Sequence, residues 1–380
     1  MENVGVVSMG IKTPIIREGD DLIKIVVDSV LNVTRMGEKM RQPAPGVKGL
    51  VKVEGEYEYN INDKDVIGIT ESIVARAAGN YVTVDEIADD IKRLIGNDKK
   101  IIVVNPIYSR NRFSMILKAI ARAANDCVSI YMPEFDEVGN PSGINQFTGV
   151  NIKEYYIELV EKEGKKCYIK EGNKNNYENE NDTVEIYCGL HDYEQWKEDY
   201  GDERHITLAD ICSDKCEYGL LGSNKANEEK LKLFPSKRSA QELVENVQKE
   251  IAHKTGKIVE VMVYGDGCFK DPVGGIWEFA DPETSPAYTS GLEGRPNEIK
   301  IKAFADDKFA SLSGNELINA IKDEIRSKDL NLVGNMSSQG TTPRRYVDLL
   351  ASLMDLTSGS GDKGTPVILV KNYFNNMSHE

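Results

Sequence analysis

Short apolar segments that lead directly into helical patterns limit what this chain can fold into. Residues 65–70 predict a buried strand, and residues 71–79 predict a helix that ends at Gly79. The same succession returns further along the chain, where a strand over 101–104 precedes a helix over 109–124. Strands that alternate with helices are typical of folds that combine α and β structure.

The length of the chain sets the expected number of domains. At 380 residues it exceeds the usual ceiling for a single hydrophobic core. A charged stretch between residues 190 and 205 separates two ordered patterns. We therefore expect an N-terminal domain over 1–200 and a C-terminal domain over 205–380.

Hydrophobic periodicity predicts the remaining elements. Asp20 is expected to cap a helix over 22–31. Further helices are expected over 151–164, 240–254, 315–325 and 344–356. Further strands are expected over 167–169, 183–188, 258–264, 298–304 and 367–370.

The chain is acidic, with 62 Asp and Glu against 47 Lys and Arg and a net charge of −15. Such a field repels phosphate backbones and anionic surfaces, which argues against nucleic acid and membranes as partners. No apolar run reaches the roughly 20 residues that cross a bilayer, and the six cysteines form no dense disulfide framework. We expect a cytoplasmic protein with reduced thiols. The pair Cys212 and Cys216 leaves a zinc site open, with buried structural cysteines as the more ordinary interpretation.

The junction between residues 70 and 71 is a candidate phosphate site. A helix that begins where a strand ends presents unpaired amides and the positive end of its dipole. Thr70 and Ser72 place hydroxyl groups beside that point, and Arg76 follows one turn later. An ordinary strand-to-helix turn without a ligand is the alternative.

Two arginines, Arg110 and Arg112, lie in the first turn of the helix predicted over 109–124. Cations there oppose the helix dipole, and a bound phosphate or carboxylate that bridged both guanidinium groups would reverse the conflict. The alternative is a pair of solvated arginines that bind surplus surface carboxylates.

Asp266 lies between two glycines at the end of the strand predicted over 258–264. Glycine permits the close approach of a ligand, which a divalent metal or a phosphate group would use. A tight turn around a hydrogen-bonded aspartate is the alternative. The Gly/Pro-rich stretch over 271–288 suits a binding loop or lid.

Taken together, these segments resemble the γ-glutamyl ligases that extend the deazaflavin coenzyme F420. The run from Ile11 to Leu22 is similar to that family's G-x-P-x-I-x-x-G-D-D-L element, and residues 65–79 are similar to its strand and helix. Leu208-Ala209-Asp210, Asp266 and the tail over 347–370 match later family elements in the same order. The resemblance covers about residues 8–95, 205–268 and 343–373.

The resemblance implies a mixed α/β (α+β) fold with mixed and antiparallel sheets, in a two-domain, intertwined homodimer. It also implies small-molecule substrates: a nucleotide (GTP, or else ATP), L-glutamate and a carboxylate acceptor such as coenzyme F420-0. The acceptor carboxylate would be activated as an acyl phosphate with the help of Mg²⁺ or Mn²⁺. Carboxylates from different strands can hold such a cation against terminal phosphates.

Carried over residue by residue, the resemblance implies that Asp210 and Asp266 are metal ligands, with Asp348 a weaker candidate. Asp210, Asp266 and Arg76 would be the catalytic residues. The phosphate-binding residues would be Gly19, Thr70, Ser72 and Arg76. Arg110 and Arg112 would bind a carboxylate of the acceptor or of glutamate, an expectation that comes from the dipole conflict.

The sequence departs from the family pattern in three places. Arg76 replaces the family's usual lysine, the turn after the strand reads Asp266-Gly267-Cys268, and residues 96–204 form an insertion without a recognised counterpart. A folate or another carboxylate-bearing cofactor therefore stays open as the acceptor. A non-catalytic nucleotide or cofactor sensor is a second hypothesis, and a redox flavoprotein is disfavoured because no dinucleotide fingerprint is present.

Overall fold

The computed structural model describes most of the chain, and the bounds of the described residues decide which expectations can be examined. They are residues 5–34, 60–96, 100–108, 113–137, 139–145, 148–172, 183–190, 193–200, 205–265, 269–270, 277–278, 287–296, 299–328, 345–359, 361–376 and 378.

The chain groups into two compact units. Unit 1 contains Met1–Ile16, Asp21–Thr70 and Arg238–Glu380, and unit 2 contains Arg17–Asp20 and Glu71–Lys237. Each unit therefore gathers segments that are distant in sequence. The boundary expected near residue 200 falls inside unit 2.

Unit 1 is built on a mixed five-stranded sheet. The strand order is β1 (Val7–Ile11), β15 (Val367–Lys371), β2 (Val66–Thr70), β11 (Glu260–Tyr264) and β14 (Ala287–Tyr288). Strands β2 and β11 are parallel, whereas the other neighbours are antiparallel. This arrangement confirms the mixed sheet that the sequence predicts.

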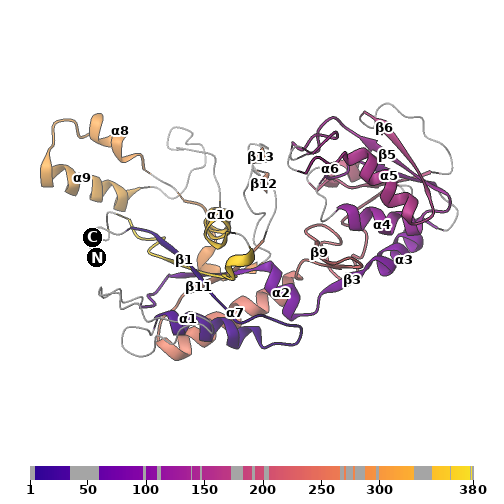
Figure 1. Cartoon of the computed structure of the whole chain (residues 1–380). Coiled ribbons are helices and arrows are strands. Elements are labelled where there is room, and N and C mark those ends of the chain that lie inside the picture. Colours follow the sequence, from indigo (N-terminus) through magenta and orange to yellow (C-terminus); the bar gives the residue numbers. More distant parts are fainter. Residues whose placement is uncertain are drawn as a thin grey trace. The chain divides into compact units, whose positions relative to one another are not determined.

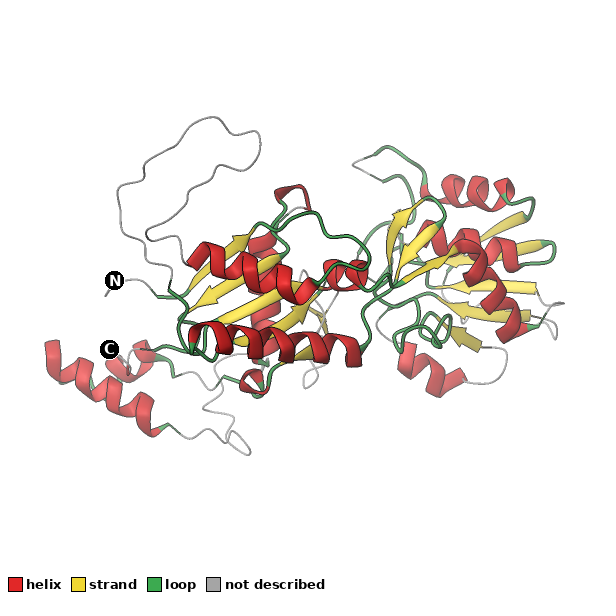
Figure 2. Cartoon of the chain, turned by 90° about the horizontal axis from the view of Figure 1, so that it is seen from below, coloured by secondary structure: helices red, strands yellow, loops and turns green. Residues whose placement is uncertain are grey.

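Helices cover both faces of the unit 1 sheet. Figures 1 and 2 show α1 (Leu22–Thr34) and α7 (Lys237–Thr255) side by side on one face and α10 (Tyr346–Ser358) on the other. On the α10 face, side chains of the central strands pack with those of the helix in one buried cluster. The other described elements of unit 1 are β12 (Phe269–Lys270), β13 (Trp277–Glu278), η2 (Ser290–Leu292), α8 (Ile301–Asp306), α9 (Gly314–Ser327) and η4 (Gly361–Lys363).

Two local expectations for unit 1 are wrong. The strand predicted over 298–304 is in fact α8, which packs against α9. Its alternating apolar residues fit a strand, but the segment contacts another helix and joins no sheet among the described strands. At the start of α1, Asp21 rather than Asp20 accepts the capping hydrogen bond, from Lys24 N at 3.0 Å. Asp20 instead accepts from Arg17 N at 2.7 Å, in the turn that precedes the helix, which begins at Leu22 as the pattern predicts.

Unit 2 contains a wholly parallel five-stranded sheet. Its order is β6 (Lys166–Glu171), β5 (Cys127–Met132), β4 (Lys100–Val104), β7 (Thr183–Tyr187) and β8 (His205–Thr207). The segment expected to be an insertion, 96–204, supplies four of these five strands. A second, antiparallel sheet joins β3 (Tyr81–Thr83), β10 (Lys230–Lys232) and β9 (Asn224–Asn227).

The central strand of the parallel sheet, β4, is apolar on both faces. Ile101 and Val103 belong to the large core cluster, which also includes α3 (Val84–Ile95), α4 (Phe113–Ala123) and α5 (Ile152–Lys162). Ile102 and Val104 belong to a second cluster with Trp196 of α6 (Tyr193–Tyr200). Successive side chains of a strand point to opposite faces, so helices cover both sides of this sheet.

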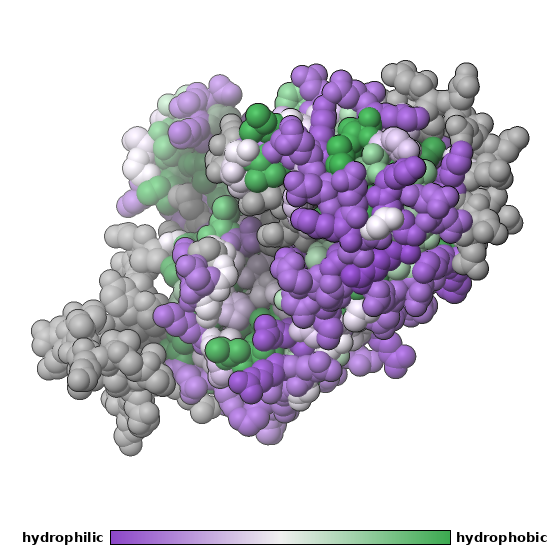
Figure 3. Space-filling view, turned by 45° about the vertical axis from the view of Figure 1, so that its right-hand side comes forward, coloured by the Kyte–Doolittle hydropathy of each residue, from purple (hydrophilic) through white to green (hydrophobic). Residues whose placement is uncertain are grey.

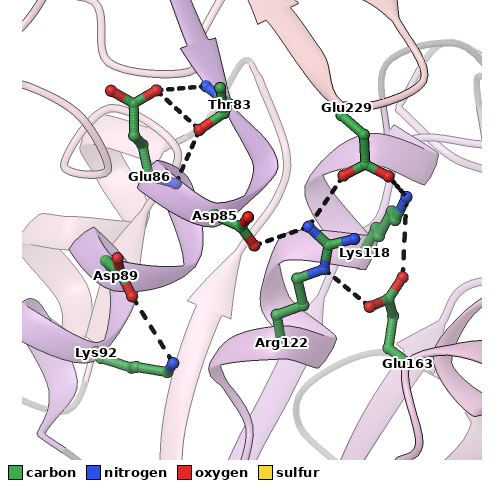
Figure 4. A network of polar contacts seen from close by, with 9 residues as sticks. All are labelled: Thr83, Asp85, Glu86, Asp89, Lys92, Lys118, Arg122, Glu163 and Glu229. Carbon is green, nitrogen blue, oxygen red and sulfur yellow. Dashed lines mark hydrogen bonds and ion pairs between the residues drawn. The ribbon is translucent and has the colours of Figure 1, made fainter.

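A network of ion pairs ties α3, α4 and α5 to the turn before β10 (Figure 4). Arg122 contacts Glu163 and Asp85 at 2.8 Å each and Glu229 at 2.9 Å, and Lys118 pairs with Glu163 and Glu229. The hydrogen bond to Glu163 is the main reason that the pKa of Arg122 is raised above its usual range. These ion pairs lie at the edge of the hydrophobic core of unit 2 and link the elements that surround it.

The surface is largely hydrophilic on the face drawn in Figure 3, where hydrophobic residues form only small patches. This distribution agrees with the 29% of charged residues in the chain.

Glu86 gives the stability of unit 2 a dependence on pH. It forms a capping box with Thr83 at the start of α3 and contacts Lys215 at 2.6 Å. The hydrogen bond from Lys215, followed by that from Thr83, lowers the pKa of Glu86 from 4.5 to about 2. A depressed carboxyl pKa stabilises the folded state above the unfolded pKa, and the contribution is lost as the pH falls from 4.5 toward 2.

We therefore expect Glu86→Gln to lower the free energy of unfolding at pH 7 by about 1 kcal/mol, a small value because the side chain is half exposed and screened by solvent. The difference from wild type should shrink as the pH falls through this window. Urea unfolding at several pH values measures it, with Glu198→Gln at an exposed position of α6 as the control. A difference that stays constant with pH would contradict the assignment.

Candidate functional site

A polar cluster surrounds the start of α2 (Glu71–Ala77) in unit 2. Glu71 is buried, and Lys232 Nζ of β10 lies 3.7 Å from its Oε2. The same Nζ donates a hydrogen bond of 2.5 Å to Ser72 Oγ, and Asn224 Nδ2 donates one of 3.4 Å to Glu71 Oε1. The buried carboxylate of Glu71 therefore holds the ammonium group of Lys232 beside the Ser72 hydroxyl.

Arg76 and Gly19 lie toward the other end of α2. Arg76 is exposed on the last turn of the helix. Gly19 has a φ of +83° and donates its backbone N–H to the carbonyl of Ala77 at 2.9 Å. A residue with a β-carbon adopts this backbone conformation only with strain, which explains the glycine before the Asp-Asp-Leu run.

Thr70 is the last residue of β2 in unit 1, and its N–H donates to the carbonyl of Pro366 at 3.0 Å. The helix that follows it has only seven residues. Its dipole is correspondingly small, so the phosphate prediction depends on the side chains of Ser72 and Arg76 more than on the helix end.

The carboxylate of Asp210 holds the turn that follows β8. Its Oδ2 accepts hydrogen bonds from Thr207 N at 2.9 Å and from Thr207 Oγ1 at 2.8 Å, while Oδ1 pairs with Lys197 of α6. Burial raises the pKa of Asp210, but Lys197 and Thr207 outweigh burial and hold the pKa below its usual range. Lys197 is about half exposed, with 52% of its side chain accessible, so a bound cation could replace it at Oδ1.

Asp348 in α10 is fully buried and bound by an arginine. Arg345 Nε donates to Oδ2 at 3.0 Å and Arg345 Nη2 donates to Oδ1 at 2.9 Å. Both carboxylate oxygens are thus engaged by one guanidinium group. The role of Asp348 in metal binding stays a prediction, and it would require Arg345 to release the carboxylate.

The other predicted site residues, Asp266, Arg110 and Arg112, lie outside the described residues, as does most of the stretch over 271–288. Strand β11 ends at Tyr264, two residues before Asp266, and β4 ends at Val104. Within the described ranges, no three His, Cys, Asp or Glu side chains are grouped so that they could hold a metal ion.

The two closely spaced cysteines are buried in the core of unit 2. Burial raises the pKa of Cys212 to about 12, and Cys216 Sγ donates to the carbonyl of Phe234 at 3.2 Å. Both side chains pack among the apolar residues of the large core cluster. These features support the structural interpretation of the pair.

The sequence did not point to Lys232 or Asn224. Both belong to short strands without a marked apolar pattern, and they reach Glu71 and Ser72 across more than 150 residues of chain. Only the antiparallel pairing of β10 with β3 brings Lys232 to this position. No local spacing could have indicated the contact.

Comparison with known proteins identifies a family for this chain. A family model described as F420-0:Gamma-glutamyl ligase matches residues 10–372, which is nearly the whole chain. No curated protein gives a significant match. In the part of the chain that the structure describes, no helix is both long and apolar enough to cross a membrane.

Proposed function

Because the chain belongs to the family of F420-0:γ-glutamyl ligases, we propose that it joins the amino group of L-glutamate to a carboxylate of coenzyme F420-0 at the expense of GTP. The observation that carries the proposal is the family match over residues 10–372. The match spans the polar cluster at α2 and every residue that the sequence predicts for the site.

The proposed reaction proceeds in two steps. The terminal phosphoryl group of GTP passes to an acceptor carboxylate oxygen, which gives GDP and an acyl phosphate. The glutamate amine then attacks the acyl carbon, an amide forms, inorganic phosphate leaves, and the ammonium proton is released to solvent. Phosphoryl transfer of this kind depends mainly on positioning and on neutralisation of negative charge.

The residues of unit 2 near α2 are proposed to bind phosphate. Ser72 supplies a hydroxyl and Arg76 a planar guanidinium group, and the proximity of Lys232 to Ser72 supports the assignment because it adds a second cation. Gly19 lets the preceding segment approach the end of α2. Thr70 is proposed to add another hydroxyl group.

Asp210 and Asp266 are proposed to hold Mg²⁺ or Mn²⁺, and Arg110 and Arg112 to bind a carboxylate of the acceptor or of glutamate. The fit of Asp210 is supported by its depressed pKa and by the exposed partner at its Oδ1. When bound, a divalent cation would neutralise charge on the terminal phosphates. Oxygen ligands of this type are the ones that these cations prefer. A homodimer remains part of the proposal.

The test is an assay of phosphate release with GTP or ATP, Mg²⁺ or Mn²⁺, glutamate and coenzyme F420-0, with mass spectrometry of the acceptor. We expect phosphate to appear only when every component is present and the acceptor to gain one glutamyl residue. Glutamylation of a folate instead would change the acceptor. Nucleotide binding by calorimetry without any product would favour the sensor hypothesis, and no nucleotide binding would refute both.

Arg76→Ala is expected to raise the KM for the nucleotide about tenfold, because it removes a charged hydrogen bond to phosphate. Arg76→Lys should lose less, since lysine keeps the charge but not the planar fork. Arg238→Ala, at an exposed position of α7, is the matched control. Equal KM values for all three variants would remove Arg76 from the phosphate site.

A further inference from the structure

The parallel sheet of unit 2 has the strand order of a doubly wound fold. Counted along the chain from β4, its strands lie in the order third, second, first, fourth, fifth. In open sheets of this order, ligands bind outside the carboxyl ends of the strands, where the order reverses. The reversal here lies at β4, between β5 on one side and β7 on the other.

A pocket of about 380 Å³ opens at this edge of the sheet. It is lined by Asn105 and Pro106, which follow β4, and by residues 133–137, which follow β5. Asn105 has a φ of +49°, so the chain turns sharply as it leaves the strand. The pocket therefore lies at the carboxyl edge of the sheet, between the ends of β4 and β5 and next to the reversal at β4.

Hydrogen bonds between the loops fix the walls of the pocket. The Asp136 carboxylate accepts from Tyr108 N at 2.9 Å and from Asn140 N at 2.7 Å, and the Tyr108 hydroxyl donates to the carbonyl of Pro133 at 2.6 Å. Glu137 Oε1 accepts from Leu190 N, beyond β7, at 2.6 Å. The loops after β4, β5 and β7 are thus joined, and the pocket is formed before any ligand arrives.

Three other side chains are left to meet a ligand. Glu134 lies two residues after the end of β5 and is exposed. Its backbone carbonyl accepts a hydrogen bond from Ser142 N at 2.9 Å, whereas its side-chain carboxylate forms no hydrogen bond or ion pair within the described ranges. Phe135 beside it exposes 53% of its surface, which is unusual for a large apolar side chain next to a pocket. Asn105 adds an amide that can both donate and accept.

We propose that this pocket binds the ribose of a nucleoside, with Glu134 accepting hydrogen bonds from the vicinal hydroxyl groups and Phe135 packing against the base. An acidic residue just after the second strand of a doubly wound sheet is well placed to bind ribose hydroxyls. A carboxylate disfavours phosphate in the same place, which argues for the sugar rather than for an anion at Glu134. The site is separate from the residues proposed for the ligase reaction.

The test is calorimetric titration of the full chain with adenosine, 2′-deoxyadenosine and AMP. We expect adenosine to bind and 2′-deoxyadenosine to bind at least about tenfold more weakly, because it lacks one hydroxyl that Glu134 accepts. Glu134→Gln should weaken adenosine binding about tenfold. Tighter binding of AMP than of adenosine would identify the ligand as a nucleotide with the same ribose contact.

Control variants separate this pocket from the ligase site. Glu158→Gln, on the exposed face of α5, and Arg76→Ala should leave adenosine binding unchanged. Phe135→Ala gives a second measure that does not change the charge of the pocket. Absence of binding by all three compounds at millimolar concentration would overturn the proposal, as would binding that Arg76→Ala abolishes and Glu134→Gln preserves. Ligase turnover should persist in Glu134→Gln.

Discussion

Replacement of Gly68 by valine is expected to destabilise unit 1 by about 3 kcal/mol or more. Gly68 lies in the middle of β2, which pairs with β15 and β11 at the centre of the sheet. A β-carbon built on Gly68 would lie 2.2 Å from Met354 Sδ of α10. Met354 is itself fully buried, so its thioether has no open space into which to move.

A double-mutant cycle can separate this steric cause from a general weakness of the strand. Met354→Ala alone is expected to cost about 2–5 kcal/mol, because it leaves a cavity. Combined with Gly68→Val it should cost much less than the sum, since the valine fills part of that space. Gly143→Ala is the control, because no atom lies within 4 Å of the added β-carbon. Hydrogen exchange should show that the loss of stability is confined to unit 1. If the two substitutions lower the free energy of unfolding additively, the steric contact between Gly68 and Met354 is contradicted.

The regular elements of the fold are predictable wherever local apolar residues decide the outcome. Residues 66–70 and 101–104 are buried almost completely, and both segments are strands as their composition indicates. The contacts that finish the fold are less local. Strand β9, with the sequence Asn-Lys-Ala-Asn, has no apolar pattern and exists because β10 pairs with it.

The candidate site shows the same limit. Gly19 and Ser72 could be singled out from their motifs, because glycine at a positive φ and a hydroxyl after a strand are local features. Lys232 reaches the site only through sheet pairing, and Asn224 reaches Glu71 from a strand more than 150 residues away in sequence. Tertiary contacts of this kind leave no trace in residue spacing.

Motifs alone understate the extent of the family relationship. The matching motifs lie within residues 8–95, 205–268 and 343–373, whereas the family model spans 10–372. The segment between the first two contains most of the parallel sheet of unit 2. Buried strands such as β4 and β7 are conventional in composition, so they reveal a fold class more readily than a family.

Asp210→Asn is expected to lower kcat of the proposed ligase reaction by about 10²- to 10³-fold while the fold remains intact. Asparagine keeps a carbonyl oxygen that can accept from Thr207 N and Oγ1, so the turn after β8 should persist. It loses the negative charge that would hold a divalent cation. Turnover as a function of Mg²⁺ and Mn²⁺ concentration, together with the urea midpoint, measures the two effects separately.

The neighbouring lysine supplies the control for this prediction. Lys197→Met removes the ion pair at Asp210 Oδ1 but leaves the carboxylate in place. If Oδ1 binds the cation, this variant should retain turnover and need less metal for half-maximal rate, because no ammonium group competes for the oxygen. If Asp210 serves only the turn, Asp210→Asn will keep its kcat and its metal dependence, and Asp210→Ala will lower the urea midpoint without a specific loss of turnover.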